Sequence, residues 1–186
     1  MRITGGSLGG RKIAAPSGMA TRPTTDRLRQ ALFNILAHGA FAPALEGARV
    51  IDLFAGSGAL GLEALSRGAA FALFIDEAAA ARAAIRRNIE ALNLGGRAKI
   101  WRRDARRPGR CAPMAPFDLA FLDPPYGKAL AEPALAGLAE GGWLRPGALA
   151  VVEESARASL SPPPSFTPLE SRDYGETRLH FLKMEG

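Results

Sequence analysis

The stretch that most constrains the fold is residues 50–65, VIDLFAGSGALGLEAL, in which an apolar run leads into spaced glycines and then into a helix-like segment. Gly56, Gly58 and Gly61 satisfy the pattern G-x-G-x-x-G, and glycine lets the backbone approach a ligand closely. Asp76 follows the next apolar run, where an acidic side chain can accept hydrogen bonds from a ribose. The pattern predicts a nucleotide-binding unit and, taken alone, fits a nicotinamide-dependent oxidoreductase.

From residue 49 onward, apolar runs alternate with segments of helical periodicity. Near-continuous apolar strands joined by crossover helices are typical of a parallel sheet that is covered on both faces. After the break SPPPS, two further strand-like runs flank the turn DYGET and predict an antiparallel hairpin at one edge. The expected fold is therefore α/β and Rossmann-like. The expected strands are 49–54, 71–76, 98–101, 117–122 and 148–153, and the expected helices between them are 58–67, 78–92 and 128–140.

The N-terminal region has a different pattern. Residues 2–15 read as two short extended pieces around a glycine-rich turn, which predicts a small hairpin or an ordered arm. RPTT then introduces a helix with an apolar stripe at helical spacing. We therefore expect an arm over residues 1–24 and one globular domain over residues 25–186.

Charge points to a polyanionic partner. The chain has a net charge of +6, and residues 1–30 carry six basic side chains against the single acidic Asp26. The N-terminus lacks the apolar core of a signal peptide, and the apolar runs are shorter than the roughly 20 residues that a membrane span needs. We expect a cytoplasmic protein without a membrane partner. Cys111 and two histidines cannot form a zinc cluster, so no metal is expected.

The position of Asp52 changes the interpretation of the glycine loop. Asp52 precedes Gly56 by four residues, so its carboxylate would repel a pyrophosphate but attract an ammonium group. S-adenosylmethionine has an ammonium, a ribose and no phosphate. Asp104 follows the third predicted strand, where it could accept a hydrogen bond from the adenine amino group of that cofactor. These three acids would lie at the carboxyl ends of successive strands, which is the ligand edge of an open parallel sheet.

A second motif follows the fourth predicted strand. Residues 123–126 read Asp-Pro-Pro-Tyr, and the prolines make this turn stiff and leave it without backbone donors. Two acceptors remain, the carboxylate of Asp123 and the carbonyl of Pro124, which suit the two hydrogens of an exocyclic amine. Tyr126 offers a flat face on which a flipped base can stack. The turn predicts transfer of a methyl group to a base amine.

Two groups of residues resemble a known family. VIDLFAGSGALGLEALSRGA and FLDPPYG are similar to the cofactor loop and catalytic turn of amino-directed methyltransferases, and RITGGSLGGRK with RPTTDRLRQALFNIL resembles the N-terminal region of the RsmD-type 16S rRNA guanine methyltransferases. The resemblance implies a class I methyltransferase fold with a mostly parallel seven-stranded sheet. It also implies transfer of a methyl group from S-adenosylmethionine to the 2-amino group of one guanine in 16S rRNA, within the small subunit or a late assembly intermediate, by a monomer.

The resemblance assigns three sets of site residues. The catalytic turn is Asp123, Pro124, Pro125 and Tyr126. The expected cofactor-binding residues are Asn34, Asp52, Phe54, Ala55, Gly56, Gly58, Asp76, Asp104 and Ala105, with Glu77 as the alternative ribose acceptor because the family commonly has a glutamate where Asp76 stands. The substrate-binding residues that the resemblance implies are Arg22, Pro23, Thr24 and Tyr126, and the charge of the arm adds Arg2, Arg11 and Lys12 as expected phosphate contacts.

Two further alternatives stay open from the sequence. The Asp-Pro-Pro-Tyr turn is shared with DNA adenine and cytosine amino methyltransferases, although 186 residues leave no segment for a separate target-recognition domain. A non-catalytic RNA-binding module would also explain the basic N-terminal region. The sequence does not identify the modified nucleotide.

Overall fold

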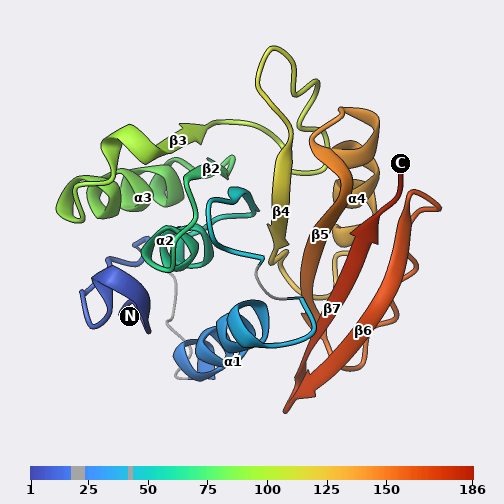
Figure 1. The fold of residues 1–186 in the computed structure, drawn as a ribbon, viewed down its shortest axis with the longest axis horizontal. Coiled ribbons are helices and arrows are strands. Elements are labelled where there is room, and N and C mark those ends of the chain that lie inside the picture. Colours follow the sequence, from blue (N-terminus) through green and yellow to red (C-terminus); the bar gives the residue numbers. More distant parts are fainter. Residues whose placement is uncertain (18–23, 42–43) are drawn as a thin grey trace.

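The computed structural model describes residues 1–17, 24–41 and 44–186, and its centre is a seven-stranded sheet in the order β3-β2-β1-β4-β5-β7-β6 (Figure 1). Strands β1 to β5 are parallel, whereas β7 is antiparallel to β5 and β6 is antiparallel to β7. The predicted parallel sheet with a C-terminal antiparallel hairpin is confirmed. The strands are β1 (Arg49–Leu53), β2 (Phe71–Ile75), β3 (Ala98–Trp101), β4 (Phe117–Leu122), β5 (Leu144–Ser155), β6 (Phe166–Tyr174) and β7 (Thr177–Met184).

The sheet reverses its strand order at β1, which pairs with both β2 and β4. The carboxyl ends of β1 and β4 therefore lie next to each other. The connections that follow them run to opposite sides of the sheet, from β1 to β2 and from β4 to β5. In open parallel sheets this point of reversal leaves a crevice in which ligands bind. The topology thus places the glycine loop after β1 beside the turn after β4.

Helices cover the sheet on both faces, which explains why the central strands β1, β2 and β4 are almost wholly buried. One buried cluster joins α1, α2 and α3 to alternate strand residues such as Val50 and Phe121, and a second joins α4 to residues such as Ile51 and Ala120. No helix in the described part of the chain is long and apolar enough to cross a membrane. The helices are α1 (Thr24–His38), α2 (Ala59–Ser66), α3 (Ala79–Ala91) and α4 (Ala131–Glu140), with short 3-10 turns η1 (Gly6–Leu8) and η2 (Gly95–Arg97).

Strand β5 differs most from its prediction, because it begins at Leu144 rather than at residue 148. Leu144 pairs with Phe117, and the register between β4 and β5 then shifts before Leu149 pairs with Leu119. The local sequence RPG reads as a turn, so the early start of β5 comes from pairing with β4.

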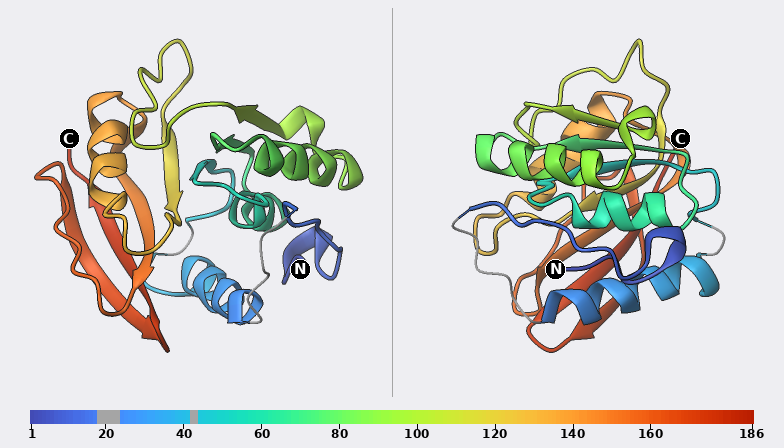
Figure 2. Two further views of the ribbon diagram at one scale, coloured as in Figure 1. Left: turned by 180° about the vertical axis from the view of Figure 1, so that it is seen from behind. Right: turned by 90° about the vertical axis from the view of Figure 1, so that its left-hand side faces the viewer.

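The N-terminal arm, residues 1–17, packs onto the body of the domain beside α1 and α2 (Figure 2). A single antiparallel bridge joins Arg2 to Lys12, so the predicted hairpin is short and is closed by η1. Ile3 and Ile13 are buried in the same core cluster as α1 and α2. Exposed and buried side chains therefore alternate along the arm. Arg2 and Lys12 are exposed, while the neighbouring isoleucines pack into the core and hold the arm in place.

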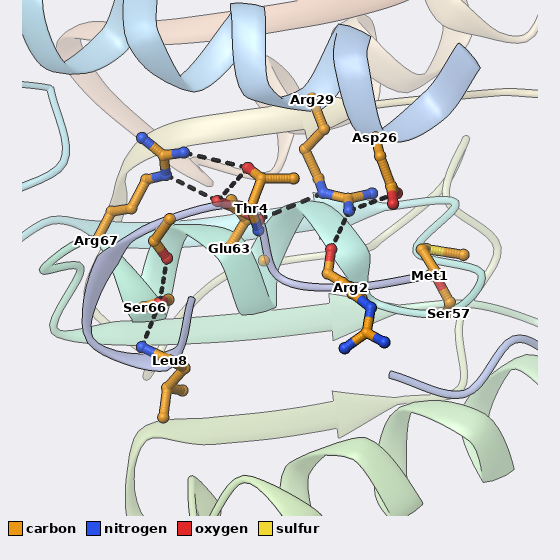
Figure 3. Close-up of polar contacts among 12 residues, drawn as sticks. Met1, Arg2, Thr4, Leu8, Asp26, Arg29, Ser57, Glu63, Ser66 and Arg67 are labelled. Atoms are coloured by element: carbon orange, nitrogen blue, oxygen red, sulfur yellow. Dashed lines mark hydrogen bonds and ion pairs between the residues drawn. The ribbon is translucent and has the colours of Figure 1, made fainter. Parts of the chain in front are cut away.

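A buried polar network fastens the arm to α1 and α2 (Figure 3). The carboxylate of Glu63, which is fully buried, accepts hydrogen bonds from the backbone N–H and the hydroxyl of Thr4, both at 2.7 Å. Its other partners are Nε of Arg29 at 3.3 Å and Nε of Arg67 at 2.8 Å. Arg29 also donates to the carbonyl of Arg2. Removal of one partner from a buried ion pair of this kind is costly, because it leaves a buried charge without compensation.

Candidate active site

Asp52 lies in β1, directly before the glycine loop that joins β1 to α2. This side chain is 1% exposed, and its Oδ2 accepts a hydrogen bond from the backbone N–H of Gly61 at 2.9 Å. Burial raises the pKa of the Asp52 carboxyl from 3.8 to about 8. Gly61 has a packing role, because a Cβ at this position would lie 2.4 Å from the ring of Phe74. The absence of a side chain at Gly61 therefore lets α2 pack closely against β2.

Asp76, which directly follows β2, forms a hydrogen bond to the same loop. Its Oδ2 accepts from the backbone N–H of Gly56 at 2.9 Å, and its Oδ1 accepts from Ala78 at 2.8 Å. Gly56 has a φ of 56°, and a Cβ there would meet only the carbonyl oxygen of Phe54, at 3.9 Å. The loop thus leaves open space above Gly56, in which a ligand could approach its backbone.

The Asp-Pro-Pro-Tyr turn follows β4, on the other side of the switch point. Pro124 is buried, Asp123 and Pro125 are exposed, and Tyr126 is half-buried. The Tyr126 hydroxyl donates to Oε1 of Glu153 at 2.9 Å and lies 2.9 Å from the hydroxyl of Thr177. Burial, together with the neighbouring carboxylates, raises the pKa of the Tyr126 phenol. These bonds fix the direction in which the ring of Tyr126 faces.

One cavity of about 820 Å³ joins the glycine loop to this turn. Five carboxylates line it: Asp52, Asp76, Asp123 and Glu153 lie at the ends of four parallel strands, and Glu77 follows Asp76. Acceptors therefore dominate the polar part of the wall, which suits ligands that carry amines and hydroxyls. Within the described residues, no group of three or more His, Cys, Asp or Glu side chains could hold a metal ion.

Most of the site residues expected from the sequence come together in this wall. The cavity lining includes Asp52, Phe54, Ala55, Gly56, Asp76, Ala105, Asp123, Pro124, Pro125 and Tyr126, and also the alternative ribose acceptor Glu77. Gly58 is buried in the same loop with a φ of 77°, where its role is to start α2.

Two other expected cofactor residues, Asn34 and Asp104, lie outside the lining, as Gly58 does. Asn34 is on the exposed side of α1, and the Asp104 carboxylate turns toward Arg106, with an Oδ2 to Nη2 distance of 2.8 Å. This ion pair holds the pKa of Asp104 below its usual range. Exposed ion pairs contribute little free energy, so the Asp104 side chain could exchange Arg106 for a ligand.

The structure describes some of the expected substrate residues and not others. Arg2, Arg11 and Lys12 are exposed on the arm. Arg22 and Pro23 lie outside the described residues, and Thr24 is the first residue of α1.

Several residues of the wall were not expected from the sequence. Glu153 directly follows the buried run of residues 148–152 in β5, and the rule that selected Asp52 and Asp76 would also have selected it. Thr177 reaches the site because β7 pairs with β5 in the register Ser155 to Thr177. The arm contributes Met1, Ala15, Pro16 and Ser17, and α1 contributes Leu28. No local signal in the sequence indicates these contacts.

Comparison with known proteins agrees with this arrangement. The model of the family described as "Conserved hypothetical protein 95" matches residues 1–183. The ribosomal RNA small subunit methyltransferase D of Escherichia coli strain K12 is 39% identical over 165 residues, which cover 89% of this chain and 80% of that protein. The chain belongs to the RsmD family.

Solved structures extend the comparison to the whole RsmD-family chain. The structure of yhhF from Escherichia coli has a TM-score of 0.83 and 35% identity, and it covers 100% of this chain and 98% of its own. The 16S rRNA N2 G1207 methyltransferase RsmC of Thermus thermophilus, in complex with AdoMet and guanosine, has a TM-score of 0.66 at 20% identity, covering 91% of this chain and 45% of its own. The class I methyltransferase fold expected from the sequence is confirmed.

Proposed function

We propose that this chain transfers a methyl group from S-adenosylmethionine to the exocyclic 2-amino group of a guanine in 16S rRNA. The observation that carries the proposal is that the glycine loop and the Asp-Pro-Pro-Tyr turn line the same cavity. The names of the RsmD-family relatives support small-subunit rRNA as the substrate class. The expected partner is the small subunit or a late assembly intermediate, and the protein is expected to act as a cytoplasmic monomer.

The residues of the glycine-loop side fit S-adenosylmethionine. Space above Gly56 and the backbone of Phe54 and Ala55 would receive the methionyl part, and Asp52 would face its ammonium. A cation beside the buried Asp52 carboxyl favours its ionised form. Asp76 or Glu77 would accept the ribose hydroxyls. Asn34, Gly58, Asp104 and Ala105 complete the proposed set, with Asp104 directed at the adenine amino group.

The turn after β4 would orient the base. S-adenosylmethionine supplies an electrophilic sulfonium methyl group when it is bound. The lone pair of an aromatic amine is delocalised, and acceptors that hold its two hydrogens out of the ring plane free that pair for attack. Asp123 and the Pro124 carbonyl provide such acceptors on a stiff backbone, and Pro125 maintains its direction. The ring of Tyr126 would stack on the base.

The exposed cations of the arm would hold the RNA backbone. Nη1 of Arg2 donates to the carbonyl of Gly10 at 2.9 Å, and Nη2 of Arg11 donates to the carbonyl of Ala91 at 3.1 Å. These bonds fix the direction of both side chains while leaving them accessible. The proposed substrate residues are these two arginines and Lys12, together with Arg22, Pro23 and Thr24 as expected from the sequence. Phosphate contacts of this kind position an RNA without reading its sequence.

A methyl-transfer assay tests the proposal against the remaining alternatives. Tritiated S-adenosylmethionine is incubated with the protein and one of three acceptors, namely free 16S rRNA, undermethylated small subunits, or duplex DNA. Label in the rRNA or the subunits supports the proposal, and label in the DNA alone contradicts it. A binding titration tests the oxidoreductase alternative, because a ligand at 100 times its Kd stabilises a protein by about 2.7 kcal/mol. Stabilisation by NAD and not by S-adenosylhomocysteine would exclude the methyltransferase.

A further inference from the structure

Glu153 lies beside Asp123 at the centre of the site. Strands β4 and β5 are parallel and pair Leu122 with Val152, so Asp123 and Glu153 are the next residues along the same register. Both side chains line the cavity. The two carboxylates therefore present acceptors side by side, one from the turn and one from β5.

Tyr126 fixes the Glu153 carboxylate in this position. Its hydroxyl donates to Oε1 at 2.9 Å and is itself held by Thr177 of β7. A carboxylate offers about four lone-pair directions on its two oxygens, so it can accept from a ligand in addition to its partners in the protein. One hydrogen bond thus joins Tyr126, whose ring would stack on the base, to Glu153, whose carboxylate would meet the edge of that base.

The Watson–Crick edges of the bases differ in what adjoins their amine. In guanine, the 2-amino group lies next to N1–H, which is a second donor. In adenine, the 6-amino group lies next to the unprotonated N1, and in cytosine the 4-amino group lies next to the unprotonated N3. A carboxylate beside the amine site therefore accepts a hydrogen bond from guanine and meets a lone pair on either of the other two bases.

We propose that Glu153 selects guanine by accepting its N1–H, while Asp123 and the Pro124 carbonyl accept the two hydrogens of the 2-amino group. This inference rests on the proposed function, since it names the residue that chooses the base for that reaction. Three donors on one edge of guanine then meet three acceptors, two from the turn after β4 and one from β5. Sites built to hydrogen-bond a substrate group can discriminate strongly against an analogue that lacks it, by factors of roughly 10⁴ in favourable cases.

The base analogue 2-aminopurine separates recognition from chemistry, because it keeps the 2-amino group and has an unprotonated N1. Small subunits are reconstituted with 16S rRNA that carries either guanine or 2-aminopurine at the modified position, after that position has been mapped with the wild-type protein. The ratio of kcat/KM for the two substrates is measured for wild-type protein and for Glu153→Gln. The glutamine keeps an acceptor for Tyr126 and can donate its amide N–H to an unprotonated N1.

We expect wild-type protein to favour guanine by about 100-fold or more, and Glu153→Gln to reduce that ratio by at least about 10-fold through a gain on 2-aminopurine as well as a loss on guanine. Thr177→Val is the matched control. It removes the second partner of the Tyr126 hydroxyl without changing the carboxylate, so it should lower both rates and leave the ratio unchanged. A purely structural role for Glu153 would give the same result as this control.

Each outcome bears on one claim. A wild-type ratio near 1, or equal ratios for wild-type protein and a folded Glu153→Gln variant, would overturn the role of Glu153. The wild-type ratio needs no variant, so the test does not depend on how well Glu153→Gln folds; binding of S-adenosylhomocysteine reports that separately. Absence of methyl transfer to the guanine substrate by wild-type protein would instead refute the proposed function.

Discussion

The side-chain amide of Asn88, on α3, donates a hydrogen bond to the carbonyl of Ser57 in the glycine loop at 2.9 Å. The same side chain accepts from the backbone N–H of Ala14 at 2.7 Å and donates to its carbonyl at 2.9 Å. Asn88 is 3% exposed. One buried amide therefore joins the N-terminal arm to the loop that lines the cofactor side of the cavity.

Asn88→Leu should weaken both the fold and cofactor binding. It leaves the buried carbonyl of Ser57 without this partner, at a cost of about 1 to 3 kcal/mol, and it removes both bonds to the partly buried backbone of Ala14. Urea denaturation and calorimetric titration with S-adenosylhomocysteine measure the two effects. Arg86→Ala, at an exposed position of the same helix, is the control and should change neither. Wild-type affinity in Asn88→Leu would show that the arm and the loop hold their positions independently.

Glu63→Ala should destabilise the protein strongly. The change leaves Arg29, which is 4% exposed, without its buried carboxylate, and breaking such a pair costs about 3 to 5 kcal/mol. The measured quantity is the free energy of unfolding in urea. The surface pair Arg178 and Asp173 provides a matched comparison, since Asp173→Ala should lower the free energy of unfolding far less. Equal losses for the two variants would refute a special role for the buried network.

Stability should depend on pH through Asp52. The pKa of this carboxyl is raised in the folded protein to about 8, so the folded state keeps its proton while the unfolded chain has already lost it. The free energy of unfolding therefore falls as pH rises between about 4 and 8, by up to about 1.4 kcal/mol per pH unit from this group. Asp52→Asn keeps an acceptor for Gly61 and should flatten the profile over this range. Parallel profiles for the two proteins would contradict the raised pKa.

The cations of the arm should act through phosphate contacts. Lys12→Ala should weaken binding to 16S rRNA and lower the slope of log K against log[salt] by about 0.7 to 0.9, the contribution of one phosphate contact. Lys183→Ala, which removes a β7 cation that is paired with Glu185, is the control and should leave the slope unchanged. An unchanged slope for Lys12→Ala would remove this residue from the proposed substrate surface.

The parts of this molecule that were predicted correctly depend on local pattern. Alternation of apolar strands and amphipathic helices identifies the parallel sheet, and the acids at the ends of those strands identify Asp52, Asp76 and Asp123 as neighbours at one edge. Glu153 obeys the same rule but was missed, because no glycine loop or proline turn next to it marks the end of its strand as part of a site.

The remaining features arise from tertiary contacts between distant segments. Glu63 lies in the apolar stretch GLEAL and is buried only because Arg29 and Thr4 reach it from other elements. Thr177 enters the site through the pairing of β7 with β5. Asp104 was expected to face the cofactor, but its carboxylate pairs with Arg106, two residues along the chain. Sequence spacing places such a group at the edge of the sheet without fixing its rotamer.

Mass spectrometry of the methylated nucleoside tests the central claim most directly. Undermethylated small subunits are incubated with S-adenosylmethionine and either wild-type protein or Asp123→Ala, and their 16S rRNA is digested to nucleosides for the measurement. The account predicts N2-methylguanosine with wild-type protein and its loss with Asp123→Ala, while binding of S-adenosylhomocysteine is kept. Formation of methylated adenosine or cytidine instead, or undiminished transfer by a folded Asp123→Ala variant, would contradict it.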